Sequence, residues 1–182
     1  MGKKRIIIKG KTFELTIPEA TILEAVSSVA ERVKADYAGR NPLFLVVLNG
    51  AFAFAADLLR LVDYPCGISF VKLASYDGLA STGRVREQLA VDATVEGRDV
   101  VIVEDIVERG YTMDYLIRRV KEYRPASVEI CALSFKPEKL VVEGLRVKYV
   151  GMTLPEAFIV GYGLDYDQEG RNLRDIYTLV EE

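Results

Sequence analysis

Hydrophobic residues along the chain recur first with helical spacing, three or four positions apart. The members of this series are Ile22, Ala25, Val26, Val29 and Val33. This period predicts an amphipathic helix. Thr21 and Glu24 have the spacing of a capping box at its start, and Gly39 can serve as a C-cap after Ala38.

Continuous apolar runs between polar turns predict buried strands. The runs cover residues 42–48, 67–75, 99–103, 127–135, 146–150 and 158–160. Helical patterns over 51–61 and about 112–123 lie between them. Before the first helix, 5–9 and 12–16 are predicted to be two short strands around the Gly10-Lys11 turn.

Strands that are apolar throughout and alternate with helices are typical of a parallel sheet covered on both faces. We therefore predict an α/β fold with a mostly parallel twisted sheet and helices on both faces. The chain is expected to form a single domain over 1–182. The N-terminal hairpin and the C-terminal stretch do not fit the alternation, so about 1–20 and 150–182 are expected to form a small hood. Ligands of such sheets bind beyond the carboxyl ends of the strands.

Composition and charge exclude several classes of function. The formal net charge of −3 over 182 residues gives no sign of a nucleic-acid partner. The apolar run Ile6–Ile8 stops at Lys9, which is too short for a signal sequence or a membrane span. Cys66 and Cys131 are expected to be buried reduced thiols, and the protein to be cytoplasmic. Because there is no histidine, acid–base chemistry must fall to carboxylate, Lys or Tyr.

The most specific segment is the run from Val100 to Met113. An apolar strand there leads into the adjacent carboxylates of Glu104 and Asp105, and then into a turn that contains Gly110. Backbone N–H groups of such a turn, with the Thr112 hydroxyl, can hold a phosphate. The two carboxylates can bind ribose hydroxyls or reach a Mg²⁺ ion through water. A strand followed by an acid-capped helix of purely structural importance has the same pattern.

This segment resembles the phosphoribosyl-diphosphate motif of type I phosphoribosyltransferases. From about residue 10 to 180 the chain is similar to their hypoxanthine–guanine branch. The resemblance implies that Glu104 and Asp105 hold the ribose hydroxyls. The turn that cradles the 5′-phosphate would consist of Glu108, Arg109, Gly110, Tyr111 and Thr112.

Two residues of this turn depart from the family pattern. The family usually has Asp at the position of Glu108, the residue implied to exchange a proton with purine N7, and Thr at the position of Arg109. The longer Glu side chain puts the rate in doubt, since a misplacement near 1 Å can cost about 10²-fold. Arg109 is expected either to pair with the phosphate or to face solvent.

By the same resemblance, the purine is bound by residues from the second half of the chain. Lys136 would reach O6, Phe158 would stack on the ring and the Ile159 backbone would read its edge. Asp165 would lie near the metal and the exocyclic edge of the base. From the residues alone, Lys136 fits a solvated charge equally well, and Phe158–Val160 fits a core strand.

The diphosphate site and a lid are also implied by the resemblance. Leu48, Asn49 and Gly50 match a loop that binds diphosphate through backbone N–H groups. The family often has Lys where Asn49 stands, and its peptide after Leu48 can be cis. Arg171 matches a diphosphate-binding arginine. The implied mobile lid contains Ser75, Tyr76, Ser81 and Thr82.

These features together predict purine salvage: Mg²⁺-dependent transfer of the phosphoribosyl group of 5-phosphoribosyl-1-diphosphate to hypoxanthine or guanine. The metal-binding residues are expected to be Glu104, Asp105 and Asp165. The family commonly forms dimers and tetramers, so a homodimer or homotetramer is expected. Two alternatives stay open: a regulatory protein that binds phosphoribosyl diphosphate without turnover, and an enzyme that prefers xanthine.

Overall fold

The computed structural model describes residues 4–75 and 85–180, and they form two sheets and three α-helices. The larger sheet has the strand order β5-β4-β3-β6-β7-β8. Neighbours from β4 to β8 pair in parallel, and β5 pairs antiparallel to β4. Its strands are β3 (Leu43–Leu48), β4 (Gly67–Ser75), β5 (Val85–Leu89), β6 (Asp99–Val107), β7 (Ser127–Phe135) and β8 (Tyr149–Thr153). The predicted α/β class with a mostly parallel sheet is confirmed.

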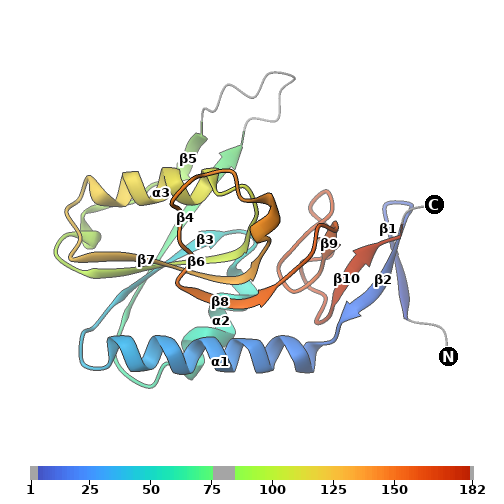
Figure 1. Ribbon diagram of the computed structural model, residues 1–182, viewed down its shortest axis with the longest axis horizontal. Helices are drawn as coiled ribbons and strands as arrows, with labels where there is room; N and C mark the ends of the chain where they lie inside the picture. The colour runs from blue at the N-terminus through green and yellow to red at the C-terminus, as the bar shows by residue number, and fades with distance from the viewer. Residues whose placement is uncertain (1–3, 76–84, 181–182) are drawn as a thin grey trace.

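Helices cover both faces of this sheet (Figure 1). α1 (Glu19–Tyr37) and α2 (Phe52–Leu61) pack on one face, and α3 (Tyr111–Lys121) packs on the other. The predicted helical series of α1 contributes Ile22, Val26, Val29 and Val33 to the core. None of the helices in the described part of the chain is long and apolar enough to cross a membrane.

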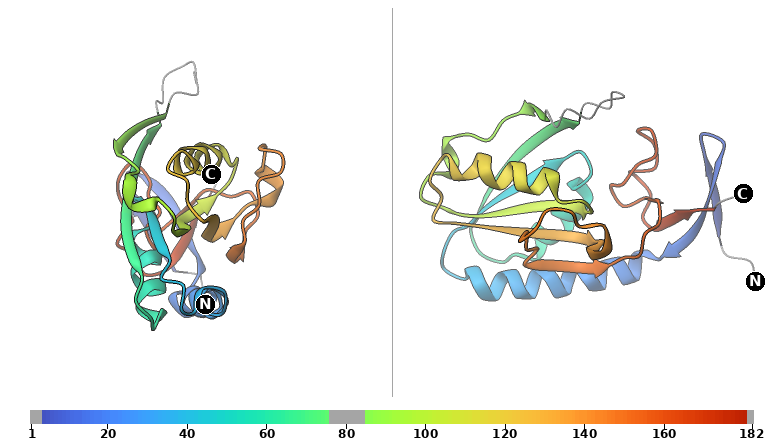
Figure 2. Two further views of the ribbon diagram at one scale, coloured as in Figure 1. Left: turned by 90° about the vertical axis from the view of Figure 1, so that its left-hand side faces the viewer. Right: turned by 45° about the horizontal axis from the view of Figure 1, so that its top comes forward.

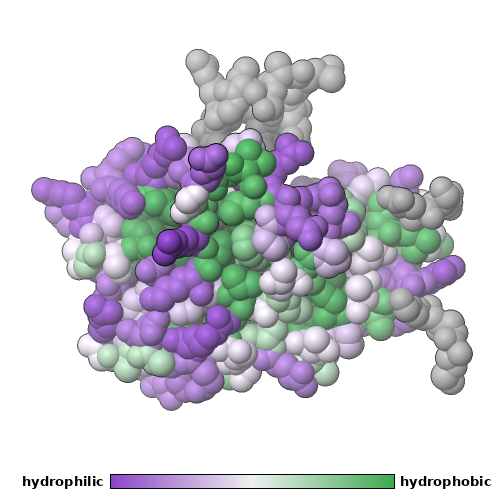
Figure 3. All heavy atoms as spheres, viewed as in Figure 1, coloured by the Kyte–Doolittle hydropathy of each residue, from purple (hydrophilic) through white to green (hydrophobic). Residues whose placement is uncertain are grey.

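The smaller sheet has the order β1-β2-β10-β9 and is antiparallel. It joins β1 (Arg5–Ile8) and β2 (Lys11–Ile17) to β9 (Ile159–Val160) and β10 (Ile176–Leu179). Figure 1 and the right-hand view of Figure 2 show it beyond one end of the larger sheet, next to the carboxyl ends of the parallel strands. Figure 3 shows apolar surface across the middle of the face that carries β8, with more polar surface along α1.

Several predicted boundaries are wrong, and the reasons are tertiary. α1 begins at Glu19 rather than at a Thr21 capping box, because the carboxylate of Asp175 accepts the Glu19 N–H at 3.0 Å. β8 lies three residues later than the predicted 146–150 strand, and β10 lies in a stretch for which no strand was predicted. Of the thiols, Cys131 is buried as expected but Cys66 is partly exposed; neither forms a disulfide.

Candidate active site

The end of β6 brings two carboxylates into the interior. The strand runs on to Val107, beyond the predicted bounds of 99–103, so Glu104 and Asp105 lie within it and before the turn. Glu104 accepts the N–H of Asp105 at 3.2 Å, and Asp105 accepts the N–H of Ile106 at 2.7 Å. Burial raises the pKa of both carboxyls, and the charge of Asp105 raises the pKa of Glu104 further. This pair is suited to a ligand that brings hydroxyl donors or positive charge.

The turn after β6 leads directly into α3. Gly110 is the N-cap residue, with φ of 88° and no side-chain capping hydrogen bond. A Cβ on Gly110 would lie 2.7 Å from Leu145 and 2.9 Å from Leu140, so only glycine fits. The carbonyl of Arg109 accepts the N–H groups of Val141 and Val142 at 3.2 and 3.3 Å. The segment that follows η2 (Pro137–Lys139) therefore fixes the backbone of the turn through these two hydrogen bonds.

This turn forms one wall of a cavity of about 310 Å³. Its lining is Glu104, Ile106, Val107, Glu108, Arg109, Gly110, Tyr111, Thr112 and Met113. The side chains of Arg109, Tyr111 and Thr112 are exposed. The uncapped N-terminus of α3 faces the turn, so its amides and positive dipole end can hold an anionic group.

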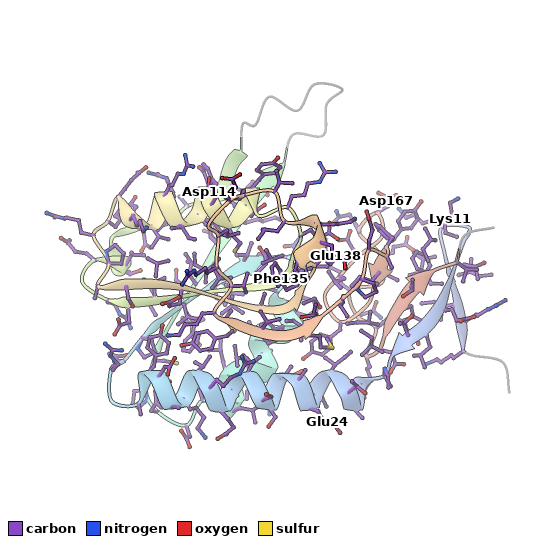
Figure 4. The ribbon with its side chains drawn as sticks, viewed as in Figure 1. Lys11, Glu24, Asp114, Phe135, Glu138 and Asp167 are labelled. Carbon is purple, nitrogen blue, oxygen red and sulfur yellow. The ribbon has the colours of Figure 1, made fainter. Side chains whose placement is uncertain are left out.

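A second cavity of about 470 Å³ adjoins the first and shares Ile106 and Glu108 with it. It gathers the predicted purine-binding residues Lys136, Phe158, Ile159 and Asp165, and the predicted catalytic Glu108 and ribose-binding Asp105 line it too. In Figure 4, Phe135 and Glu138 mark the end of β7 and the start of η2, on the side that faces the smaller sheet. Lys136 lies between these two residues.

Lys136 is not a solvated charge, because its side chain is only 3% exposed. Its ammonium forms an ion pair with Glu108 and donates to the Ala157 carbonyl at 2.7 Å. Phe158 is 47% exposed, and its ring centroid lies 5.7 Å from that of Tyr166 in an edge-to-face arrangement. The cavity therefore offers a cation, a carboxylate and an aromatic face to a flat polar ligand.

Sequence reasoning missed several residues of this cavity. Lys139 and Glu156 line it and form an ion pair at 2.9 Å. Phe13 of β2 packs beside Phe158, with the two ring centroids 6.3 Å apart. Lys139 follows Lys136 by one turn of η2, and this spacing could have indicated that both side chains lie on the same side of the turn. The contribution of β2 depends on pairing between distant segments, which no local pattern shows.

The predicted diphosphate residues line a third cavity, of about 800 Å³, which includes Leu48, Asn49 and Arg171. The Leu48–Asn49 peptide is cis. Arg171 forms an ion pair with Asp165 at 2.6 Å and donates to the Gly163 carbonyl at 2.8 Å. Through Asp165 this cavity adjoins the one that holds Lys136 and Phe158.

Gly50 lies where these segments meet. A Cβ there would come within 1.6 Å of the Asp105 carboxylate, so the position requires glycine. Gly50 is thus in direct contact with Asp105 of the carboxylate pair, and Leu48 and Asn49 line one cavity together with Arg171. Of the predicted lid, Ser75 ends β4, while Tyr76, Ser81 and Thr82 lie outside the described residues.

The predicted metal trio does not form a ready-made metal site. Within residues 4–75 and 85–180, no three acidic or cysteine side chains gather closely enough to hold an ion on their own. Asp165 is instead paired with Arg171.

Comparison with known proteins assigns this arrangement to a family. A model of the phosphoribosyl transferase domain matches residues 18–167. The hypoxanthine-guanine phosphoribosyltransferase of Lactococcus lactis is 39% identical over 170 residues, which cover 93% of this chain and 92% of the relative.

Solved structures agree. A hypoxanthine-guanine phosphoribosyltransferase from Bacillus anthracis, with a HEPES molecule in its active site, has a TM-score of 0.85 at 34% identity, over 92% of this chain and 97% of that one. A glutamic acid mutant of an invariant aspartic acid in HPRTs has a TM-score of 0.84 at 39% identity, over 91% and 94% of the two chains. The chain therefore belongs to the phosphoribosyltransferase family, in its hypoxanthine-guanine branch.

Proposed function

We propose that this protein transfers the phosphoribosyl group of 5-phosphoribosyl-1-diphosphate to hypoxanthine or guanine, giving IMP or GMP and diphosphate. The observation that carries the proposal is the pair of adjoining cavities. One has the uncapped start of α3 for a phosphate, the other has Glu108, Lys136 and Phe158 for a base, and Glu108 lines both.

The base is held by three contacts in this proposal. The Lys136 ammonium donates to the O6 carbonyl, which adenine lacks. Phe158 stacks on the ring, a contact worth roughly 1–3 kcal/mol per base. The backbone at Ile159, which is nearly buried at the edge of the same cavity, reads the edge of the ring.

The phosphoribosyl diphosphate binds the groups next to the base cavity in this proposal. The turn from Glu108 to Thr112 binds the 5′-phosphate through its amides. Glu104 and Asp105 accept hydrogen bonds from the ribose hydroxyls. Arg171 and the backbone of Leu48–Gly50 bind the diphosphate, whose charge grows as it leaves. Ser75, Tyr76, Ser81 and Thr82 remain candidates for a lid that excludes water.

In the reaction the bond from C1 to the diphosphate oxygen breaks and a bond from C1 to purine N9 forms. The base loses one proton from N7, and we propose that the Glu108 carboxylate accepts it. A structure of a glutamic acid mutant of an invariant aspartic acid in HPRTs is among the similar proteins. We propose that Glu108 stands at the position of that aspartate.

Magnesium fits the donors that are present. Glu104 and Asp105 are adjacent buried carboxylates whose pKa values are raised by burial, and a divalent cation would relieve this cost. Mg²⁺ characteristically binds one or two carboxylates together with substrate phosphates and water. Glu104, Asp105 and, once released from Arg171, Asp165 would hold it, and it would neutralise charge on the diphosphate.

We also propose that the protein forms a homodimer or homotetramer in the cytoplasm. The two free thiols, one of them partly exposed, are suited to a reducing compartment. Light scattering of the purified protein gives its mass in solution; a mass of one chain, 20.3 kDa, would contradict the assembly.

The test of the function is a direct assay with Mg²⁺, phosphoribosyl diphosphate and each purine, followed by detection of the nucleotide. We expect IMP and GMP, no AMP and no product when Mg²⁺ is chelated. XMP as the main product would favour the xanthine-preferring alternative. Calorimetric binding of phosphoribosyl diphosphate without any nucleotide would favour a regulatory protein, which the departures at Glu108 and Arg109 keep open.

A further inference from the structure

We propose that the hydrogen bond between Tyr162 and Asp57 is a positioning contact that sets the spacing between Arg171 and the Leu48–Gly50 segment. It would act on the diphosphate half of the site and leave the base half unaffected. This inference rests on the proposed function, since it assigns the diphosphate to these two groups.

The contact joins the middle of α2 to the segment after β9. Tyr162 is 6% exposed and packs in the same core cluster as Ala51, Phe54 and Leu58. Its hydroxyl donates to the carboxylate of Asp57. The bond thus ties the helix that follows Gly50 to the chain that leads to Asp165.

The backbones beside this bond are in direct contact as well. A Cβ on Gly163 would lie 2.0 Å from the carbonyl oxygen of Gly50, and Gly163 has φ of 96°. Glycine at position 163 therefore lets the two segments touch. A shift of Tyr162 would be transmitted to Gly50, since there is no side chain between the two backbones to absorb it.

Arg171 is held by the same segment. Its guanidinium donates to the Gly163 carbonyl at 2.8 Å, and the Gly163 N–H donates to the Arg171 carbonyl at 2.9 Å. The second guanidinium nitrogen pairs with Asp165 at 2.6 Å. Arg171 is therefore fixed to the residue that follows Tyr162 and lies in the same cavity as Asn49.

The two side chains proposed to contact the base, Lys136 and Phe158, have separate supports, although Asp165 of the same cavity pairs with Arg171. Lys136 is held by Glu108 and the Ala157 carbonyl, and Phe158 packs against Phe13 and Tyr166. None of these contacts passes through Asp57. Loss of the Tyr162–Asp57 bond should therefore weaken phosphoribosyl diphosphate and diphosphate selectively.

The chain offers a matched control. Tyr149 is also buried, and its hydroxyl donates to the carboxylate of Asp36 at 2.6 Å, toward the amino end of the sheet. Tyr149→Phe removes the same kind of bond away from the site. Tyr162→Phe and Tyr149→Phe are therefore expected to lower the unfolding temperature to a similar extent.

The experiment measures binding of phosphoribosyl diphosphate with Mg²⁺, and of diphosphate, by calorimetry, together with the KM for hypoxanthine. Tyr162→Phe and Asp57→Leu should each raise both dissociation constants roughly 3- to 10-fold, the effect of one buried hydrogen bond. Asp57→Asn, which keeps an acceptor for the hydroxyl, should restore most of the affinity. The KM for hypoxanthine and all three constants of Tyr149→Phe should stay at the parental values.

Unchanged diphosphate affinity in Tyr162→Phe and Asp57→Leu would overturn the inference while leaving the function intact. An equal loss of diphosphate affinity in Tyr149→Phe, or an equal rise in the KM for hypoxanthine, would show that the Tyr162–Asp57 bond contributes only to overall stability. Either result would also overturn the inference. If the unsubstituted protein binds no phosphoribosyl diphosphate, the proposed function fails, and this inference with it.

Discussion

Glu108 borders both the proposed phosphate cavity and the proposed base cavity, which also share Ile106. Its carboxylate keeps the chemistry of the family's aspartate but sits one methylene farther from the backbone. We expect Glu108→Asp to preserve or raise turnover and Glu108→Ala to lower kcat about 10²-fold or more, the usual range for loss of a general base. Steady-state assays of the purified variants measure both.

Glu138 provides a control of the same charge nearby. It lies exposed in η2, outside the lining of the base cavity, so Glu138→Ala should leave kcat unchanged. Equal rates for the parent and Glu108→Ala would remove Glu108 from the mechanism.

We expect the Glu104 carboxylate, which is proposed to bind the ribose, to lower the free energy of unfolding at neutral pH. Its pKa is raised in the folded protein by burial and by the charge of Asp105, so the unfolded chain loses this proton at lower pH than the native protein does. Stability therefore falls as pH rises from the unfolded pKa toward the folded one. Glu104→Gln, which cannot ionise, should avoid this loss.

Glu104→Gln is accordingly expected to be more stable than the parent at pH 7, and to lose this advantage below about pH 4, near the unfolded pKa of Glu. A gain of about 1 kcal/mol would raise the unfolding temperature by roughly 2–4 °C for a chain of this size. Thermal unfolding at both pH values measures it. If Glu104→Gln is less stable than the parent at pH 7, the buried Glu104 carboxylate stabilises the fold and the prediction is wrong.

At this scale the sequence identified the residue types of the site but not their surroundings. Lys136 alone is indistinguishable from a surface lysine, and its burial against Glu108 and Ala157 depends on strands that are distant in sequence. The partial exposure of Cys66 likewise depends on neighbours that no local pattern specifies.

Among the elements, α1 begins with help from the far end of the chain. The Asp175 carboxylate accepts the Glu19 N–H, and this bond is the leading cause of the lowered pKa of Asp175. Asp175→Ala should lower the free energy of unfolding by about 1 kcal/mol, as loss of an N-cap does. Urea unfolding measures it.

Asp175→Asn keeps the acceptor and should recover most of that loss, although Asp175 also pairs with Lys4 and Tyr177. Equal stability of the alanine variant and the parent would show that this cap contributes nothing.

Buried elements were the most predictable from sequence. β3, β4 and β7 follow their apolar runs within one residue. Both faces of β3 and β7 are covered, whereas Ile68 and Phe70 of β4 are exposed. β6 was predicted too short, since Glu104 and Asp105 interrupt the apolar pattern while the backbone continues to pair with β7 as far as Val107. β8 and β10 were misplaced or missed because long-range pairing sets their bounds.

For the molecule as a whole, two cavities of the candidate site are lined by segments from both sheets. A ligand that binds such a site in the native state alone stabilises the whole chain. Phosphoribosyl diphosphate with Mg²⁺ at a hundred times its dissociation constant should add about 2.7 kcal/mol. For a chain of this size that corresponds to roughly 5–10 °C in the unfolding temperature.

Differential scanning calorimetry with and without the ligand measures this shift, and chelation of Mg²⁺ should abolish it. A ligand-independent unfolding temperature would contradict a shared site between the sheets.

The pairing of β9 with the rest of its sheet has a consequence for biosynthesis. β9 carries Ile159 beside Phe158, and in the described part of the chain it reaches β2 only through β10, which comes last in sequence. The strands of the parallel core can therefore pair as they leave the ribosome, whereas the segment with Phe158 and Ile159 joins the smaller sheet only after β10 has also left the exit tunnel.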